Sequence, residues 1–167
     1  MATAAGAGDR SAPLGPEARD EVESREYPRH PVVGVGAVVW FGARVLLIKR
    51  GKPPRLGQWS IPGGAQRLGE TVAEAAAREV FEETALRIER PEVIATVDLI
   101  ERDDDGRVRY HYTLIDVTAE APSDAARAGS DATEVRWFLP DEIHTLGLWS
   151  ETVRIIGLAA ERRPRCR

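Results

Sequence analysis

Three glutamates near the middle of the chain, Glu79, Glu82 and Glu83, have the type and spacing of a site for a hard metal ion. They stand at i, i+3 and i+4, so in a helix all three side chains project from one side. Like charges at this spacing repel one another, and the second half of a helix disfavours anions because of the helix dipole. A sequence that tolerates both penalties is expected to hold a cation there. Oxygen-only ligands favour Mg²⁺ or Mn²⁺ over zinc.

A solvated acidic helix face is the alternative explanation of the same pattern. Arg78 could then pair with Glu82 one turn later and with Glu74 one turn earlier. The glycine-rich approach to the helix favours the metal site instead. Gly63 and Gly64 bring backbone groups beside the helix without side chains that would obstruct an incoming phosphate.

The helix that carries the glutamates is predicted to begin after Thr71. Thr71 and Glu74 form a Thr-x-x-Glu capping box, which is a sequence signature of a helix start. An apolar stripe follows at four-residue steps: Val72, Ala76 and Val80. The preceding passage, residues 51–69, holds three prolines and five glycines and is expected to be a long irregular loop. Loops of this length in compact domains are usually functional.

Strands are expected on both sides of this helix. The runs that predict them are 32–40, 45–49, 92–101, 107–117 and 134–139. The first is β-branched and mostly apolar, so it is expected to be buried on both faces. The third and fourth are joined through Asp105-Gly106, a strong hairpin signal. A helical region begins near Pro140, is interrupted at Gly147 and restarts at Ser150. The mixture of strands and helices predicts one α/β domain.

Composition excludes several classes of protein. The chain has 167 residues, 43% of them hydrophobic and 30% charged, with 23 basic against 27 acidic residues and a net charge of −4. This balance argues against a duplex-binding protein, so no nucleic-acid partner is expected. No apolar run approaches the roughly 20 residues needed to span a bilayer, and no secretory signal is recognisable, so we expect a cytoplasmic location without membrane contact. A single cysteine, Cys166, allows no intrachain disulfide.

The two ends of the chain differ from its middle. Residues 1–26 are rich in Ala, Gly, Pro and charge, and we expect them to be disordered because they cannot bury enough apolar surface. Residues 164–167 form a basic tail. The folded domain is therefore expected over residues 27–163.

Residues 64–86 resemble the signature of the Nudix hydrolases, Gly-x5-Glu-x7-Arg-Glu-U-x-Glu-Glu-x-Gly-U, in which U is a bulky aliphatic residue. The matching positions are Gly64, Glu70, Arg78, Glu79, Val80, Glu82, Glu83 and Leu86. The resemblance extends to residues 59–64 before the signature and to residues 134–143 after it, and covers about residues 32–160. It implies an α/β/α sandwich with a mixed β-sheet.

Ala85 is the departure from this signature, which has glycine at that position. A glycine at a helix exit serves a left-handed conformation, in which a residue with a Cβ loses roughly 1 kcal/mol or more. We expect a left-handed or otherwise irregular exit at Ala85, because Arg87 and Ile88 should already lead towards the next strand. Alanine neither offers nor removes a metal ligand, so the departure concerns local geometry more than chemistry.

The resemblance implies hydrolysis of a nucleoside diphosphate linked to another moiety, at its pyrophosphate. It makes Glu79 and Glu83 the principal ligands of Mg²⁺ or Mn²⁺, with Glu82 assisting directly or through water. The carbonyl of Gly63 is implied as a further ligand. Arg78 is expected to orient a carboxylate beside the metal.

The general base is expected outside the signature, as in several members of the family. Glu134, which follows a loop of small residues, is our first choice. Asp131 and Glu101 are the alternatives, and Glu134 is equally compatible with an ordinary charged start of a strand.

Substrate contacts are expected from a basic cluster and an aromatic residue. Arg50, Lys52 and Arg55 come shortly before residues 59–64 and are candidates for binding phosphate groups, with a solvated rim as the alternative. Tyr112 could stack on a nucleobase, although strand tyrosines more often pack against neighbouring side chains.

The flanking runs 31–35 and 45–50 resemble the smaller ADP-ribose pyrophosphatases. Many of those place a proline one strand beyond the signature, and residues 92–118 contain none. We expect a small-molecule nucleotide as partner, with ADP-ribose cleaved to AMP and ribose 5-phosphate, and leave a homodimer open. The alternatives are a nucleoside-triphosphate pyrophosphatase of the house-cleaning type and a nucleotide-binding regulator without turnover.

Overall fold

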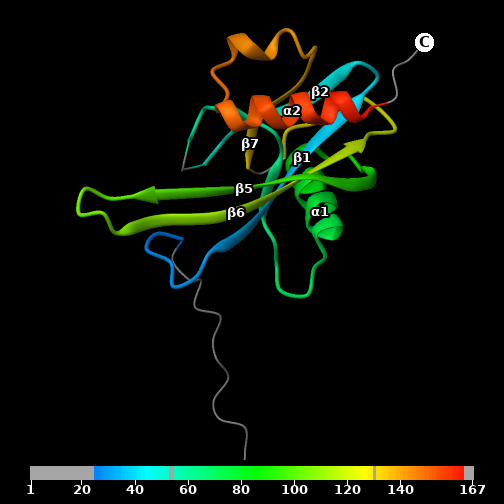
Figure 1. Ribbon diagram of the computed structural model, residues 1–167. Helices are drawn as coiled ribbons and strands as arrows, with labels where there is room; N and C mark the ends of the chain where they lie inside the picture. Colours follow the sequence, from blue (N-terminus) through cyan, green and yellow to red (C-terminus); the bar gives the residue numbers. More distant parts are fainter. Residues whose placement is uncertain (1–24, 53–54, 130, 164–167) are drawn as a thin grey trace, which may run out of the picture.

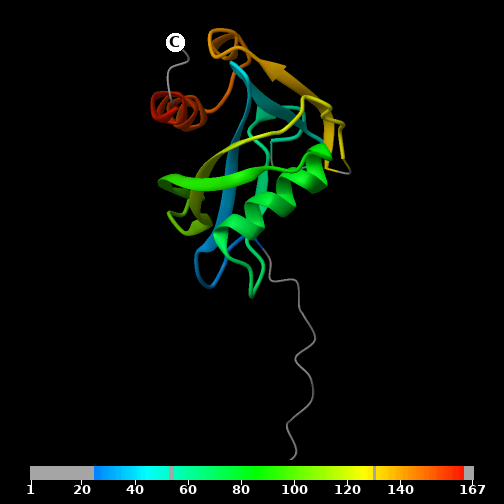
Figure 2. The same cartoon turned by 90° about the vertical axis from the view of Figure 1, so that its right-hand side faces the viewer.

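A mixed β-sheet forms the centre of the molecule, and two helices lie on its opposite faces (Figures 1 and 2). The computed structural model describes residues 25–52, 55–129 and 131–163. Of residues 1–26, for which we expect disorder, only residues 25 and 26 are described. The basic tail at 164–167 also lies outside the described residues.

Seven strands and three helices make up the described chain. The strands are β1 (Val32–Phe41), β2 (Arg44–Arg50), β3 (Trp59–Ser60), β4 (Gly63–Ala65), β5 (Glu89–Arg102), β6 (Val108–Glu120) and β7 (Ala132–Phe138). The helices are α1 (Val72–Thr84), a short 3-10 helix (Ile143–Thr145) and α2 (Ser150–Arg162). The main order across the sheet is β3-β2-β1-β6-β5, with β4 paired to β1 and β7 paired to β2.

Strand β1 organises both hydrophobic cores because its side chains alternate between the two faces of the sheet. Val35, Ala37 and Val39 pack in the core that α1 covers. Val38 and Trp40 pack in the core that α2 covers. The strand runs parallel to β6 and antiparallel to β2 and β4. The expected burial of residues 32–40 on both faces and the α/β/α sandwich with a mixed sheet are therefore confirmed.

Helix α1 begins and ends as the sequence predicts. The Thr71 hydroxyl accepts a hydrogen bond from the Glu74 N–H at 3.2 Å, and the Glu74 carboxylate accepts one from the Thr71 N–H at 2.8 Å. Ala85 follows the helix in the left-handed conformation, with φ 58° and ψ 10°, and its N–H donates to the carbonyl of Phe81. The capping box and the left-handed exit are both confirmed.

The passage before α1 is more ordered than the sequence indicates. Within residues 51–69, β3 pairs with β2, and β4 pairs with β1 through the register Gly36–Gly63 and Val35–Gly64. The expectation of an irregular loop over residues 51–69 was therefore wrong. Strands of two and three residues are too short to show a period in the sequence. Residues 92–101 and 107–117 do form the predicted antiparallel hairpin, although both strands are longer than expected. No helix in the described part of the chain is long and apolar enough to cross a bilayer.

Candidate active site

The three glutamates of α1 divide between two environments. Glu83 is 5% exposed, and its Oε2 accepts a hydrogen bond from the Gly63 N–H at 2.9 Å. The carboxylate of Glu79 lies so close to Gly64 that a Cβ there would stand 2.5 Å from it. Glu82 is exposed and pairs with Arg67 at 3.2 Å. Helical spacing places the three on one side, but only Glu79 and Glu83 reach β4.

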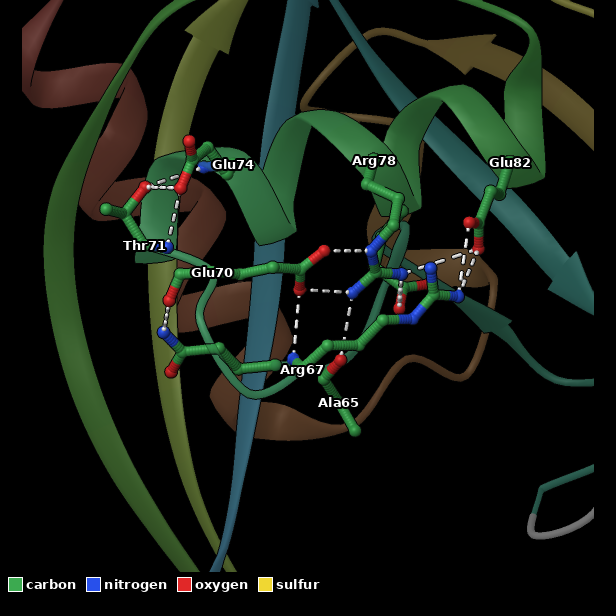
Figure 3. Close-up of polar contacts among 9 residues, drawn as sticks. Ala65, Arg67, Glu70, Thr71, Glu74, Arg78 and Glu82 are labelled. Atoms are coloured by element: carbon green, nitrogen blue, oxygen red, sulfur yellow. Dashed lines mark hydrogen bonds and ion pairs between the residues drawn. The ribbon is translucent and has the colours of Figure 1, made fainter. Parts of the chain in front are cut away.

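Arg78 connects α1 to the loop before it and to β4 (Figure 3). Its Nε and Nη2 donate to the two carboxylate oxygens of Glu70 at 2.5 and 2.8 Å, and Nη2 also donates to the carbonyl of Ala65 at 3.1 Å. Its Nη1 donates to Glu79 Oε1 at 2.5 Å and lies 3.4 Å from Glu82. Such fork-shaped pairs fix direction as well as distance. Arg78 therefore holds the Glu79 carboxylate in place against β4.

The charges around Arg78 shift the ionisation of their neighbours. Hydrogen bonds from Arg78, then from the Arg67 N–H, lower the pKa of Glu70 to about 2, and its carboxylate raises the pKa of Arg78 above its usual range. The alternative explanation, a solvated acidic face, would pair Arg78 with Glu74 as well, but the Glu74 carboxylate is bonded to Thr71 at the helix start. The pairing with Glu82 is present.

Glu83 is an acid whose charge is poorly compensated by the protein. Its pKa is raised to about 7, mainly by burial; the charges of Glu79 and Asp131 act in the same direction, while the Gly63 N–H and the charge of Arg50 oppose the shift. A nearby positive ion would favour the charged form of such a carboxyl group.

These residues fit a hard divalent cation. Among the described residues, no three Asp, Glu, His or Cys side chains already converge as a metal cage. The carboxylates of Glu83 and Glu79 nevertheless meet two consecutive residues of β4, Gly63 and Gly64 respectively, and a side chain at Gly64 would fill the space that Glu79 occupies. Oxygen donors without sulfur or imidazole suit Mg²⁺ or Mn²⁺, which keep part of their coordination for water and phosphate.

A pocket lies between the sheet and the start of α2 and reaches Gly63 and Gly64. Its apolar wall includes Ile61, Val97, Leu99, Leu114, Trp149 and Ile155. Its polar and charged lining includes Arg50, Arg55, Ser60, Asp116, Glu151 and Thr152. The pocket therefore extends from Gly63 and Gly64, which the α1 carboxylates contact, to an apolar region beside Trp149.

The structure brings three of the four expected substrate residues to this pocket. Arg50, Arg55 and Tyr112 line it. The Arg55 guanidinium lies 5.1 Å from the centre of the Trp149 ring, a cation–π distance. Lys52 is not among the lining residues, and its Nζ donates to the carboxylate of Asp131.

The three candidates for the general base occupy different places. Glu134 lies on β7, pairs with Lys49 at 3.8 Å and Arg136 at 3.6 Å, and does not line the pocket. Glu101 lies 3.9 Å from Arg55, beside the pocket. The charge of Asp131 contributes a small part of the raised pKa of Glu83, so this carboxylate lies within electrostatic reach of a signature glutamate.

Two pocket residues escaped the sequence analysis, Asp116 and Trp149. Asp116 stands between Ile115 and Val117 in an otherwise apolar stretch of β6. A charged residue inside a buried strand is unusual, and this feature of the sequence could have identified Asp116 as a candidate. Trp149 directly precedes α2 and carries no such signal.

Comparisons with known proteins agree with this geometry. A family model described as the NUDIX domain matches residues 30–156. An ADP-ribose pyrophosphatase of Methanocaldococcus jannaschii is 35% identical over 120 residues, which are 72% of this chain and 68% of that protein.

Two solved structures share the fold over most of both chains. A MutT NUDIX hydrolase from Burkholderia pseudomallei is 30% identical with a TM-score of 0.68, covering 78% of this chain and 98% of that one. The NUDIX domain of Shewanella oneidensis NrtR, complexed with ADP ribose, is 25% identical with a TM-score of 0.68, covering 80% and 89%. The signature on α1, the sandwich and these matches lead to one conclusion. This chain belongs to the Nudix hydrolases, enzymes that cleave nucleoside diphosphates linked to another moiety.

Proposed function

We propose that this Nudix hydrolase cleaves ADP-ribose to AMP and ribose 5-phosphate. The observation that carries the proposal is the continuous pocket from Gly63 and Gly64, beside the α1 carboxylates, to Trp149 at the start of α2. Such a pocket offers a place for the pyrophosphate at one end and for a nucleoside at the other. The relative named as an ADP-ribose pyrophosphatase and the ADP-ribose complex of a similar domain support this choice of substrate.

The divalent ion is proposed to be held by Glu79 and Glu83, with the carbonyl of Gly63 and with Glu82 assisting directly or through water. A bound Mg²⁺ or Mn²⁺ neutralises phosphate oxygens and lowers the pKa of an attacking water. Glu79 is already oriented towards β4 by Arg78. We propose Mg²⁺ as the usual ion and Mn²⁺ as a substitute.

The remaining charged residues complete the proposed site. Arg50 and Arg55, which line the pocket, attract the pyrophosphate. Asp131 or Glu134 takes the proton of the attacking water, and the electrostatic effect of Asp131 on Glu83 supports the former. Lys52, paired with Asp131, is proposed to position that carboxylate rather than to bind phosphate.

A substrate screen tests the proposal. The purified chain is incubated with ADP-ribose, other dinucleotides and nucleoside triphosphates, each with Mg²⁺ and with Mn²⁺, and the products are separated by chromatography. AMP with ribose 5-phosphate from ADP-ribose, at the highest kcat/KM of the set, is the expected result. A clear preference for nucleoside triphosphates, with release of pyrophosphate, would instead support the second candidate, which the likeness to a MutT hydrolase favours.

A further inference from the structure

Asp116 is a buried acid in the wall of the pocket. It lies in the middle of β6, directly opposite Gly36 of β1, and is 6% exposed. A Cβ on Gly36 would collide with its Oδ1. Glycine at position 36 therefore leaves room for the carboxylate beside the pocket that both residues line.

No residue in the described part of the chain donates a hydrogen bond to this carboxylate. The two charged groups that act on it, Arg154 and Glu151, belong to α2 and are paired with each other at 2.7 Å. No fully buried side-chain oxygen in the described part of the chain lacks a partner, so the unbonded oxygens of Asp116 open onto the pocket that it lines. A carboxylate with so little exposure and no donor from the protein is unfavourable and calls for an explanation. A ligand that brings its own donor group into the pocket would supply what the protein omits.

The surroundings of Asp116 indicate what kind of group that donor belongs to. Leu114 and Tyr112 project from the same face of β6, and Ile61 approaches the same space over Gly36. Flat apolar walls suit a nucleobase, whose two faces need no hydrogen bonds. A ribose or a phosphate has polar groups on all sides, and a phosphate would also be repelled by the carboxylate.

We propose that Asp116 is a specificity-determining residue that accepts a hydrogen bond from the exocyclic amino group of a nucleobase seated in this pocket. It therefore selects adenine over hypoxanthine, which has an oxygen in place of that amino group. The oxygen would face the carboxylate with lone pairs on both sides, and the N–H of hypoxanthine lies at the neighbouring ring position, away from a carboxylate that is placed for the amino group. A site built for a donor at one position rejects an analogue that lacks it there. The choice of adenine rests on the proposed function, whereas the need for a donor rests on Asp116 alone.

Binding of AMP and IMP to the full chain tests this without any turnover. Titration calorimetry of wild type should give about tenfold tighter binding of AMP, which corresponds to about 1.4 kcal/mol and lies within the cost of an acceptor left without a donor. In Asp116→Asn the carboxamide can either donate or accept, so the ratio should fall to within about threefold, mainly through gain of IMP binding. Asp116→Ser, smaller and neutral, should also lose the selectivity. It provides a second measurement if the first variant folds poorly.

Asp98→Asn is the matched control. Asp98 is exposed on the neighbouring strand β5 and accepts a hydrogen bond from Thr113, away from the pocket lining. The Asp98→Asn variant should keep the wild-type ratio of AMP to IMP affinity.

Three outcomes would overturn the inference. They are equal binding of AMP and IMP by wild type, an unchanged ratio in both Asp116 variants, and no binding of AMP at all. If Asp116 bonded ribose hydroxyls instead, its variants would lose AMP and IMP equally, and wild type would reject 2′-deoxy-AMP. Failure of ADP-ribose hydrolysis with intact AMP selectivity would refute the proposed substrate but leave the role of Asp116 standing.

Discussion

The carboxylates on α1 and the carboxylate of Asp116 are held in opposite ways. Glu79 and Glu82 receive hydrogen bonds from arginine, and Glu83 receives one from a backbone N–H. Asp116 receives none from the described residues, although it is nearly as buried as Glu83. One region is fixed in place before any ligand arrives, whereas the other keeps its acceptor free. The first arrangement suits a centre that must keep its geometry, and the second suits a centre that must discriminate.

Removal of divalent metal should produce the largest effect and would test the first half of this comparison. Because Glu79 and Glu83 supply only oxygen donors, hydrolysis should stop in EDTA and return on adding excess Mg²⁺ or Mn²⁺. Product formation is followed by chromatography, with and without chelator. Full activity in EDTA would show that the α1 carboxylates serve only the fold.

Glu83→Gln should lower kcat by a factor on the order of 100 or more, since even residues behind a metal ligand commonly contribute 10- to 100-fold. The fold should remain, and the melting temperature of the metal-free protein should rise, because burial of this carboxyl is unfavourable for its charged form. Circular dichroism and steady-state kinetics give the two readouts.

Glu74→Gln is the control on the same helix. Glu74 only completes the capping box, in which glutamine also serves, so its variant should keep most of the activity. Similar losses of kcat in the two variants would mean that the acidic face is structural.

Gly64→Ala should reduce kcat by about 10- to 100-fold, because the new Cβ would displace the carboxylate of Glu79 from β4. Gly157→Ala in α2 is a suitable control, since a Cβ there meets nothing within 4 Å. It should leave kcat unchanged and stabilise the helix by up to about 1 kcal/mol. Unchanged kinetics in Gly64→Ala would show that the position of Glu79 is not critical.

Asp116→Asn should expose the energetic cost of an unpaired acid. Burial raises the pKa of Asp116 from 3.8 to about 6, with Glu151 raising it and Arg154 opposing the shift. A raised pKa means that stability is fully present below pH 3.8 and is lost as the pH rises through 6. The variant should therefore be more stable than wild type at pH 8, by up to about 3 kcal/mol.

Urea unfolding at several pH values measures this difference. The gain should shrink between pH 6 and pH 4, where wild-type Asp116 takes up a proton in the folded state while it stays mostly ionised in the unfolded state, and it should vanish below pH 3.8. A gain independent of pH would mean that the charge of Asp116 is compensated in the folded protein. The contrast with the α1 carboxylates would then disappear.

The contrast also explains what the sequence could and could not predict. The α1 region follows from spacing within one segment, so the capping box at Thr71, the glutamate face and the exit at Ala85 could all be read from neighbouring residues. The outward direction of Glu82 could not be predicted in this way, because it depends on Arg67 in the preceding loop. Helical spacing describes a face of a helix and not what lies opposite that face.

The pocket could not be predicted because several separate elements build it. Gly36, Ile61, Asp116 and Trp149 come from β1, the β3–β4 connection, β6 and the residue before α2. Their approach depends on the parallel pairing of β1 with β6 and on the position of α2 over one face of the sheet. No local period encodes either feature, and β3 and β4 are too short to show one.

Ala85→Gly should have the smallest effect, and its sign is informative. Ala85 has φ 58°, a conformation that costs a residue with a Cβ roughly 1 kcal/mol, and Leu86 after it is buried, so the exit cannot easily relax. Glycine would relieve this strain but would also gain freedom in the unfolded chain, which offsets part of the benefit. The net gain should be a few tenths to about 1 kcal/mol, or up to roughly 2–4 °C in melting temperature by calorimetry. Ala77→Gly, inside the same helix, should instead lower the melting temperature by a similar amount, because glycine weakens a helix interior by about 1 kcal/mol. Both changes remove one methyl group, so opposite signs would assign the effect to backbone conformation, and a fall in both would show that the alanine at position 85 is unstrained.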